Sequence, residues 1–426
     1  MEGVFLLASL FLLFLIGAPV AIALGLSSIL TLILFSNESL LSLAQHFFRT
    51  VEVYSLMAIP FFILAGNLMT SGGMAQRLVD FAIALTGPIR GGLAMASVLA
   101  CTLFAALSGS SPATVVAVGS ICIAGMVKAG YSKPFATGII TNAGTLGIMI
   151  PPSIVMVIYG AITDSSVGAL FMAGVVPGIA LALAMMGTIY VLARKRQMAV
   201  QAMRADGLIK PGIRAVWGLL LIVIILGGIY AGIFTPTEAA AAAAVYAFIV
   251  ALFINRDLKL AAVPAVLIGS ARLTAMLMFI VANAYLFAFV LTTEQIPQTV
   301  TQALLSFDLP VWAFLLLMNV VLLLAGNFMN ASAVVLIMAP IIFPIAMELG
   351  IDPIHLGVIM VINMEIGMVT PPVGLNLFVA SGITNMPLMD VIRASAPWLT
   401  LLLAMLLVIT YVPAISLALP RLLGML

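Results

Sequence analysis

Charged residues are scarce in this chain of 426 residues: only 7% are Asp, Glu, Lys or Arg, whereas 64% are hydrophobic. A soluble domain has about a quarter of its residues charged, so this composition cannot supply a surface that faces water. The few charges nearly cancel, with 16 basic and 14 acidic residues, and they offer no basic face for nucleic acid. The sequence therefore predicts an integral membrane protein that does not bind nucleic acid.

The residues that carry most enzymatic chemistry are also scarce. The chain has two histidines and two cysteines, and Cys101 and Cys122 lie in apolar runs that are typical of inert buried thiols. It has no GxSxG, HExxH or P-loop motif, so it lacks the signature motifs of a serine hydrolase, a zinc protease and a nucleotide-driven pump. We expect no enzyme activity and no cofactor. An intramembrane enzyme of another kind and a passive anion channel stay as alternatives to a transporter driven by an ion gradient.

Long apolar runs dominate what is present. They do not alternate apolar with polar residues as the strands of an outer-membrane barrel do, so we expect helices. A helix needs about 20 mostly apolar residues to cross a bilayer. About eleven segments qualify, some of them broken: Val4–Phe35, Val53–Met69, Gly91–Leu107, Pro134–Thr163, Gly168–Ala193, Ala215–Phe234, Ala239–Ile254, Ala261–Leu291, Val311–Ala325, Pro353–Ser381 and Leu388–Ala414.

One polar linker, residues 194–214, divides the chain into a first half (1–193) and a second half (215–426). Six of the sixteen basic residues fall in this linker against a single acid, Asp206, which predicts that it lies in the cytoplasm. The two halves are related, because several Gly and Pro residues recur 220 positions later. Such duplication is characteristic of secondary transporters. The matching residues are Gly130, Gly147, Pro151, Pro152 and Pro177 with Gly350, Gly367, Pro371, Pro372 and Pro397.

Four interruptions fall inside the apolar segments, one pair in each half. The runs 108–114 and 326–332 gather Ser or Asn residues before a new helix that is too short to cross the bilayer, which predicts two re-entrant hairpins. Broken helices are predicted over 134–163 and 353–381, because each contains a double proline that leaves preceding carbonyl groups without partners. One such break alone would indicate a kink filled by a neighbouring helix. Four in matched positions favour function.

Interrupted backbone at membrane depth must face protein, water or an ion. Neutral carbonyl and hydroxyl oxygens suit Na⁺, whereas transition metals would call for His or Cys clusters, which the sequence lacks. The N-termini of half-helices favour an anion, so we expect a substrate that bears a carboxylate. Glu365, an acid inside an apolar stretch, is a candidate for ion coupling or proton transfer. It is equally a candidate for a structural carboxylate held by neighbouring groups.

These motifs resemble the large membrane (M) subunit of the tripartite ATP-independent periplasmic (TRAP) transporters, of the sialic acid and C4-dicarboxylate type. The resemblance covers essentially the whole chain. It implies an elevator-type, sodium-coupled importer of an organic acid in the bacterial inner membrane, an all-α polytopic protein with two repeats. It also implies a small four-helix membrane subunit (Q type) and a periplasmic substrate-binding protein. The motifs are Ser-Gly-Ser-Ser at 108–111, Ile-Pro-Pro-Ser at 150–153, Gly-Ile-Phe-Thr-Pro-Thr-Glu-Ala-Ala at 232–240, Gly-Asn-Phe-Met at 326–329 and Asn-Met-Glu-Ile-Gly-Met-Val-Thr-Pro-Pro-Val-Gly-Leu-Asn at 363–376.

The resemblance further implies which residues form the site. Ser153 and Asn376, just past the double prolines, are the candidates for the substrate. Many relatives carry an acid at the second hairpin tip where this chain has Asn330, so no carboxylate role is assigned there. The sequence does not identify the organic acid. One sodium ion is assigned to Ser108, Ser110, Ser111, Asn142 and carbonyls near Gly147 and Ile150, and a second to Gly326, Asn327, Asn330, Ser332 and Thr370.

Overall fold

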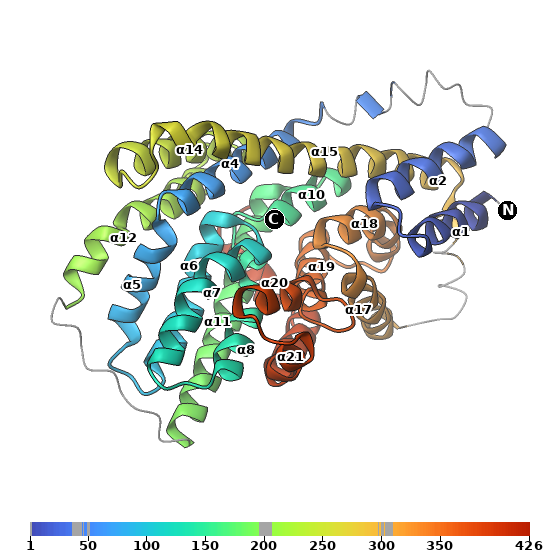
Figure 1. The fold of residues 1–426 in the computed structure, drawn as a ribbon. Coiled ribbons are helices and arrows are strands. Elements are labelled where there is room, and N and C mark those ends of the chain that lie inside the picture. Colours follow the sequence, from blue (N-terminus) through green and yellow to red (C-terminus); the bar gives the residue numbers. More distant parts are fainter. Residues whose placement is uncertain are drawn as a thin grey trace.

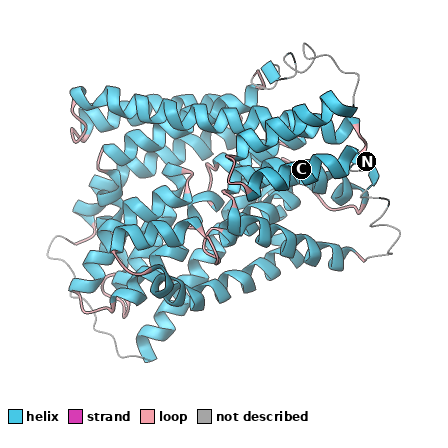
Figure 2. Cartoon of the chain, turned by 45° about the vertical axis from the view of Figure 1, so that its right-hand side comes forward, coloured by secondary structure: helices cyan, strands magenta, loops and turns pink. Residues whose placement is uncertain are grey.

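The computed structural model describes residues 2–35, 45, 47–48, 52–195, 207–296, 298–299, 302 and 310–426. All regular structure within these residues is helical (Figure 2). Ten helical stretches among them are long and apolar enough to cross a bilayer. The predicted all-α, multi-pass fold class is therefore confirmed, and the number of spans is close to the predicted eleven. Residues 196–206, most of the predicted cytoplasmic linker, lie outside the described residues.

The first half of the chain supplies the hairpin and broken helix that the sequence predicts there (Figure 1). Its helices are α1 (Glu2–Leu15), α2 (Val20–Phe35), η1 (Tyr54–Met57), α4 (Ala58–Ser71), α5 (Met74–Thr86), α6 (Gly92–Ser108), α7 (Ser111–Lys128), α8 (Lys133–Ala143), α9 (Leu146–Met149), α10 (Ile154–Thr163) and α11 (Val167–Lys195).

The second half follows the same plan after its first three spans. Its helices are α12 (Ile209–Ile222), η2 (Val223–Gly227), α13 (Gly228–Tyr230), α14 (Pro236–Ile249), η3 (Val250–Ile254), η4 (Leu260–Ala262), α15 (Val263–Thr293), α17 (Val311–Phe328), α18 (Ala331–Glu348), α19 (Pro353–Gly367), α20 (Leu375–Thr384), α21 (Leu388–Tyr411) and α22 (Ala414–Leu422).

One predicted span is wrong in its continuity. The segment Val4–Phe35 consists of two short helices, α1 and α2, that pack against each other. Gly17 between them adopts a φ of 80°, a left-handed conformation that glycine tolerates better than other residues. Pro19 then cannot donate a backbone hydrogen bond to the helix before it, so the chain turns instead of continuing.

Helices α2, α4, α14 and α15 form an outer layer along one side of the molecule, with α4 packed between α14 and α15 (Figure 1). A capping box begins α14: Thr235 Oγ1 accepts from the Glu238 backbone amide at 3.3 Å, and Glu238 Oε2 accepts from the Thr235 backbone amide at 2.8 Å. Alanine side chains of α14 such as Ala240 and Ala243 are fully buried, which lets α4 approach closely. One face of the outer layer therefore packs against the remaining helices of the molecule.

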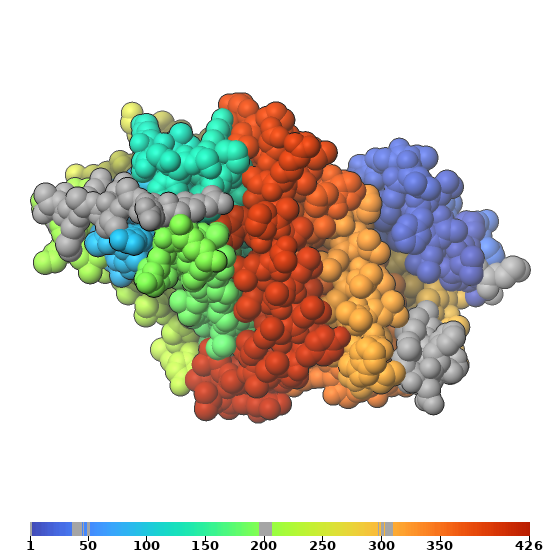
Figure 3. Space-filling model, turned by 90° about the horizontal axis from the view of Figure 1, so that it is seen from below, coloured from blue at the N-terminus to red at the C-terminus, as the bar shows by residue number. Residues whose placement is uncertain are grey.

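We call helices α6–α11 and α17–α22 the hairpin core. This group contains both hairpins and both broken helices. Its elements repeat with an offset of 220 positions: α7 and α18 begin and end at equivalent residues, and both double prolines contain a cis peptide bond. The halves are interleaved, because α8 packs on α21, α7 on α20 and α10 on α18. Seen from below, the C-terminal helices (red) lie between first-half residues and the orange helices of the second half (Figure 3). Neither half folds around a core of its own.

Candidate functional site

The first hairpin turns at Gly109, between α6 and α7. Gly109 has a φ of 58°, and a Cβ added there would lie 2.8 Å from the Pro152 carbonyl oxygen, so this turn requires glycine. The hydroxyls of Ser108 and Thr114 are 3.0 Å apart across the turn. Ser110 occupies the position before α7, and its side chain does not cap the helix. Its hydroxyl is therefore left available for another partner.

The first broken helix lies directly against this hairpin tip. A Cβ added at Gly147 would lie 2.7 Å from the Ser110 carbonyl oxygen and 2.8 Å from the Ser111 Cα atom. After α9 the chain becomes extended at Ile150 and passes the double proline. Ser153 then caps α10, because its hydroxyl oxygen accepts from the Met156 amide at 3.3 Å. The absence of a side chain at Gly147 lets the hairpin and the break meet backbone to backbone.

The second hairpin and second break meet in the same way. A Cβ added at Gly367 would lie 2.7 Å from the Cα atom of Gly326, so the ends of α19 and α17 touch through two glycines. The Gly374 amide donates to the Asn327 carbonyl oxygen at 3.3 Å. Asn330 caps α18, with its Oδ1 accepting from the Ala333 amide at 2.9 Å. The second tip is therefore fixed to its broken helix by backbone contacts.

The Asn376 side chain joins the second half to the first hairpin tip. Asn376 Nδ2 donates to the Ser111 hydroxyl oxygen at 2.6 Å, which ties α20 to the tip of the first hairpin. The backbone amide of Asn376 donates to the Met368 carbonyl oxygen at 2.9 Å. Asn376 Oδ1 is buried and has no hydrogen-bond partner within the described residues. That carbonyl oxygen is available to a bound group.

Both hairpin tips line one cavity of about 240 Å³, which we call the hairpin cavity. The hairpin core and the outer layer both contribute to its wall, so it lies between the two groups of helices. No charged side chain is among the residues that line it in the described part of the chain. The predicted site residues that line it are Ser108, Ser110, Ser111, Asn330 and Ser332.

Other predicted residues lie behind this surface. Asn142 Nδ2 donates to the Gly138 carbonyl oxygen at 2.8 Å and to the Ser395 carbonyl oxygen at 3.5 Å, so its side chain lies at the contact of α8 with α21. Thr370 donates back to the Ile366 carbonyl oxygen at 2.6 Å. Neither residue lines the hairpin cavity, nor do Gly147, Ile150, Ser153, Gly326, Asn327 and Asn376, although the breaks contribute Ile148 and Met368 to its wall.

Glu365 is fully buried in α19. Its carboxyl group lies against the backbone of Ile148 and Met149 in the first broken helix. Neither carboxyl oxygen has a hydrogen-bond partner that meets normal geometry within the described residues. Glu365 therefore connects the second half to the break of the first, but it does not reach the hairpin cavity.

Two polar residues of the cavity wall were missed from the sequence. Asn67 and Thr70, on α4 of the outer layer, face the hairpin tips across the cavity. Asn67 is the only amide side chain in the apolar segment Val53–Met69, and a polar residue at membrane depth is by default a functional candidate. That signal was available. What it could not show is that α4 lies opposite the hairpins.

The chemistry of the cavity suits an anion accompanied by cations. The first turns of α7 and α18, at Pro112 and Ala331, line it, and the N-terminus of a helix carries roughly half a positive charge. No lysine or arginine among the described lining residues can neutralise an anion there. No cluster of His, Cys, Asp or Glu in the described part of the chain could hold a transition metal. Any balancing charge must therefore come from helix ends and bound ions.

The fold is that of a polytopic membrane transporter. A solved structure with the same architecture is the YdaH transporter of Alcanivorax borkumensis, with a TM-score of 0.64 at 15% identity over 87% of this chain and 86% of that one. Residues 7–415 match the family described as "Tripartite ATP-independent periplasmic transporter, DctM component". The chain belongs to this family of TRAP large permeases.

Two relatives span nearly the same length. The C4-dicarboxylate TRAP transporter large permease protein DctM of Pseudomonas aeruginosa is 63% identical over 404 residues, 95% of each chain. The sialic acid TRAP transporter large permease protein SiaM of Vibrio cholerae is 34% identical over 407 residues, again 95% of each. These relatives are permease subunits and not enzymes. The predicted family and the multi-pass inner-membrane location are thereby confirmed, and a tripartite system implies further components beside this chain.

Proposed function

We propose that this chain is the permease of a sodium-coupled importer that carries an organic anion across the inner membrane by an elevator-type movement of the hairpin core. The observation that supports this most is the hairpin cavity, in which both tips and two helix N-termini surround a space whose described lining residues carry no charge. An anion there needs cations beside it, because a lone charge away from water is costly. Binding of the anion would then depend on sodium.

Unsatisfied oxygens next to the tips fit sodium ligands. Asn327 Oδ1 and Asn376 Oδ1 are buried without partners in the described part of the chain, and both belong to segments that touch a hairpin tip. Neutral oxygens of this kind match the preference of hard cations. A buried carbonyl oxygen without a donor costs free energy, so a bound ion would repay that cost.

The substrate we propose is a C4-dicarboxylate. The relative named for C4-dicarboxylate transport shares 63% of its residues with this chain, whereas the relative named for sialic acid shares 34%. The proposed partners are a small four-helix membrane subunit and a periplasmic binding protein that delivers the acid. The dependence of uptake on the binding protein is part of the same test.

The test is uptake of radiolabelled succinate into proteoliposomes that contain this chain with its small subunit, with the binding protein added outside. We expect saturable uptake that requires an inward sodium gradient and disappears when potassium replaces sodium or the binding protein is omitted. Uptake that is indifferent to sodium would contradict the coupling. Ohmic currents through single molecules would indicate a channel instead.

A further inference from the structure

The hairpin cavity has a neighbour. A second cavity of about 780 Å³ lies between the C-terminal end of α4 and a wall made of the loop before η4 and the N-terminal part of α15. The two cavities share three lining residues, Asn67, Thr70 and Leu273, so they adjoin at these side chains. The far wall of the second cavity includes Asp257 and Lys259, in the loop between η3 and η4.

That loop lies on the side of the membrane where the basic linker 194–214 lies. The stretch Ile209–Tyr230 is long enough to cross the bilayer once after the linker, and Pro236–Ile254 is long enough to cross back. The loop 255–259 that follows is therefore on the linker's side, which the excess of basic residues assigns to the cytoplasm. The two adjoining cavities thus lead from the hairpin tips toward the cytoplasm.

The junction of the cavities carries an available hydrogen-bond donor. Asn67 Nδ2 donates one hydrogen to the Ser270 hydroxyl oxygen at 2.9 Å, and Ser270 in turn donates to the Val266 carbonyl oxygen at 2.8 Å. An amide nitrogen has two hydrogens, and no second partner of Asn67 lies within the described residues. Thr70 already donates to the Gly66 carbonyl oxygen at 2.7 Å. Asn67 is therefore fixed in position by Ser270 and keeps one amide hydrogen that can be donated to a bound anion.

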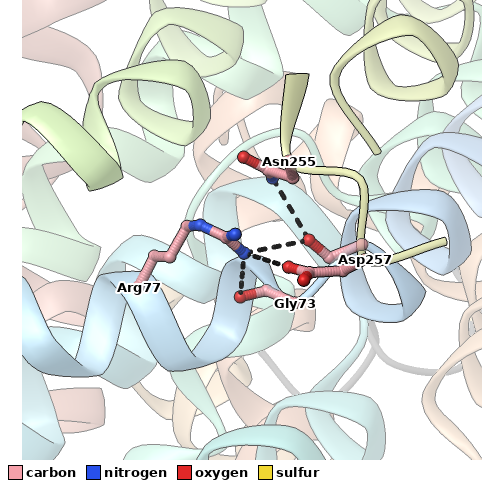
Figure 4. Close-up of polar contacts among 5 residues, drawn as sticks. Gly73, Arg77, Asn255 and Asp257 are labelled. Carbon is pink, nitrogen blue, oxygen red and sulfur yellow. Dashed lines mark hydrogen bonds and ion pairs between the residues drawn. The ribbon is translucent and has the colours of Figure 1, made fainter. Parts of the chain in front are cut away.

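The charges at the outer end are arranged to favour an anion. Lys259 is exposed and forms no ion pair within the described part of the chain. Asp257, which would repel an anion, is paired with Arg77 (Figure 4). Arg77 also donates to the Gly73 carbonyl oxygen at 3.0 Å, and Asn255 donates to the Gly72 carbonyl oxygen at 3.1 Å. These contacts hold the loop to the end of α4 and leave Lys259 as the unneutralised charge among the described residues that line the second cavity.

We propose that the passage between α4 and α15 is the route by which the organic anion leaves the hairpin cavity for the cytoplasm, with Asn67 as a ligand at its junction and Lys259 as the cation at its mouth. This inference rests on the proposed function for the identity of the anion. The existence of the passage rests on the two adjoining cavities, and its sidedness rests on the order of the spans after the basic linker. The experiment therefore measures access and transport separately.

Access is measured by labelling introduced cysteines. The native Cys101 and Cys122 are both buried, and Cys101→Ala with Cys122→Ala provides the background. Asn67→Cys and Thr70→Cys, in the full complex, should react with a membrane-impermeant thiol reagent in inside-out vesicles and not in right-side-out vesicles. Saturating succinate should slow both reactions. Leu68→Cys, buried on the same helix, should stay unlabelled, and Ser55→Cys, at the other end of the span, should react from the opposite side.

Transport is measured with charge variants of the loop. Lys259→Glu should lower the rate of sodium-driven succinate uptake about tenfold at low ionic strength, and added salt should shrink the effect. Lys259→Arg, which keeps the positive charge, should recover most of the rate that Lys259→Glu loses. Arg256→Glu is the matched control, because Arg256 is exposed on the same loop but does not line the cavity, and its rate should stay near that of the wild type.

The outcomes separate the two proposals. Absence of cytoplasmic labelling at both Asn67→Cys and Thr70→Cys, while Ser55→Cys reacts, would overturn the passage even if succinate uptake is normal. Sided labelling without protection by succinate, in a complex that takes up no succinate, would support the passage and contradict the proposed substrate. Equal losses in Lys259→Glu and Arg256→Glu would remove the role of Lys259 at the mouth.

Discussion

Asn376 of α20 donates its 2.6 Å hydrogen bond to Ser111 of α7, a residue 265 positions earlier in the chain. The equivalent positions in the duplicated arrangement, 220 residues away, are Met156 and Ala331, which cannot form this bond. The duplication thus provides two hairpins and two breaks, but only the first hairpin tip is tied to the opposite half by this pair. We infer that the two halves of the site have different tasks.

Replacing Asn376 tests this asymmetry. Asn376→Met introduces the residue found at position 156 and leaves the buried Ser111 hydroxyl without its donor, which should cost about 1–3 kcal/mol. We expect a lower unfolding temperature in detergent and weaker succinate uptake. Ser111→Ala should have a similar effect, and the double variant should cost no more than either alone. Fully additive losses would show that the two side chains act independently.

The contact between Gly326 and Gly367 gives a prediction about stability. Gly367→Ala should destabilise the protein by about 1–3 kcal/mol, because the added methyl group would meet backbone atoms of Gly326 that have no rotamer to change. Gly382→Ala is the control, since nothing lies within 4 Å of its Cβ position. Thermal unfolding of the purified variants measures both. An unchanged midpoint for Gly367→Ala would mean that the second tip and its break are not held in contact.

The two hairpin tips should respond differently to removal of their polar side chains. Asn330→Ala removes a helix cap and should cost about 1 kcal/mol, whereas Ser110→Ala removes no capping bond and should leave stability unchanged. Under the proposed coupling, both variants should need more sodium for half-maximal uptake. Asn330→Asp keeps the cap and separates the effects. Wild-type sodium dependence in both alanine variants would remove these residues from the sodium sites.

Glu365 gives a prediction about coupling. Glu365→Gln keeps the shape of the side chain and removes an ionisable group that is buried against the backbone of Ile148 and Met149, so the variant should be at least as stable as the wild type. If the carboxyl group exchanges a proton during transport, the variant should lose the pH dependence of uptake. Glu348→Gln, near the end of α18, is the control. Identical pH profiles for the wild type and Glu365→Gln would leave the carboxylate with a structural role.

Much of the architecture could be predicted from local features. The double prolines located both broken helices because the nitrogen of proline carries no hydrogen and cannot donate to a helix in any fold. The turn at Gly17 was missed because a continuous apolar run hides a short break. Asn142 was grouped with the first hairpin, and its sodium role stays a prediction, but its contact with α21, a helix of the other half, was not predictable from local features.

The sequence by itself determined that the chain enters a membrane as helices and where those helices are interrupted. Because the chain has so few charged residues, it cannot present a surface to water and enters the membrane. Backbone groups in hydrocarbon must then be satisfied within each segment. Only the tertiary structure decided that the two interrupted regions face one cavity, that Asn67 of α4 lies opposite them, and that Asn376 reaches Ser111. These relations depend on how helices from distant parts of the chain pack, and no local pattern of residues specifies which helix becomes the neighbour of which.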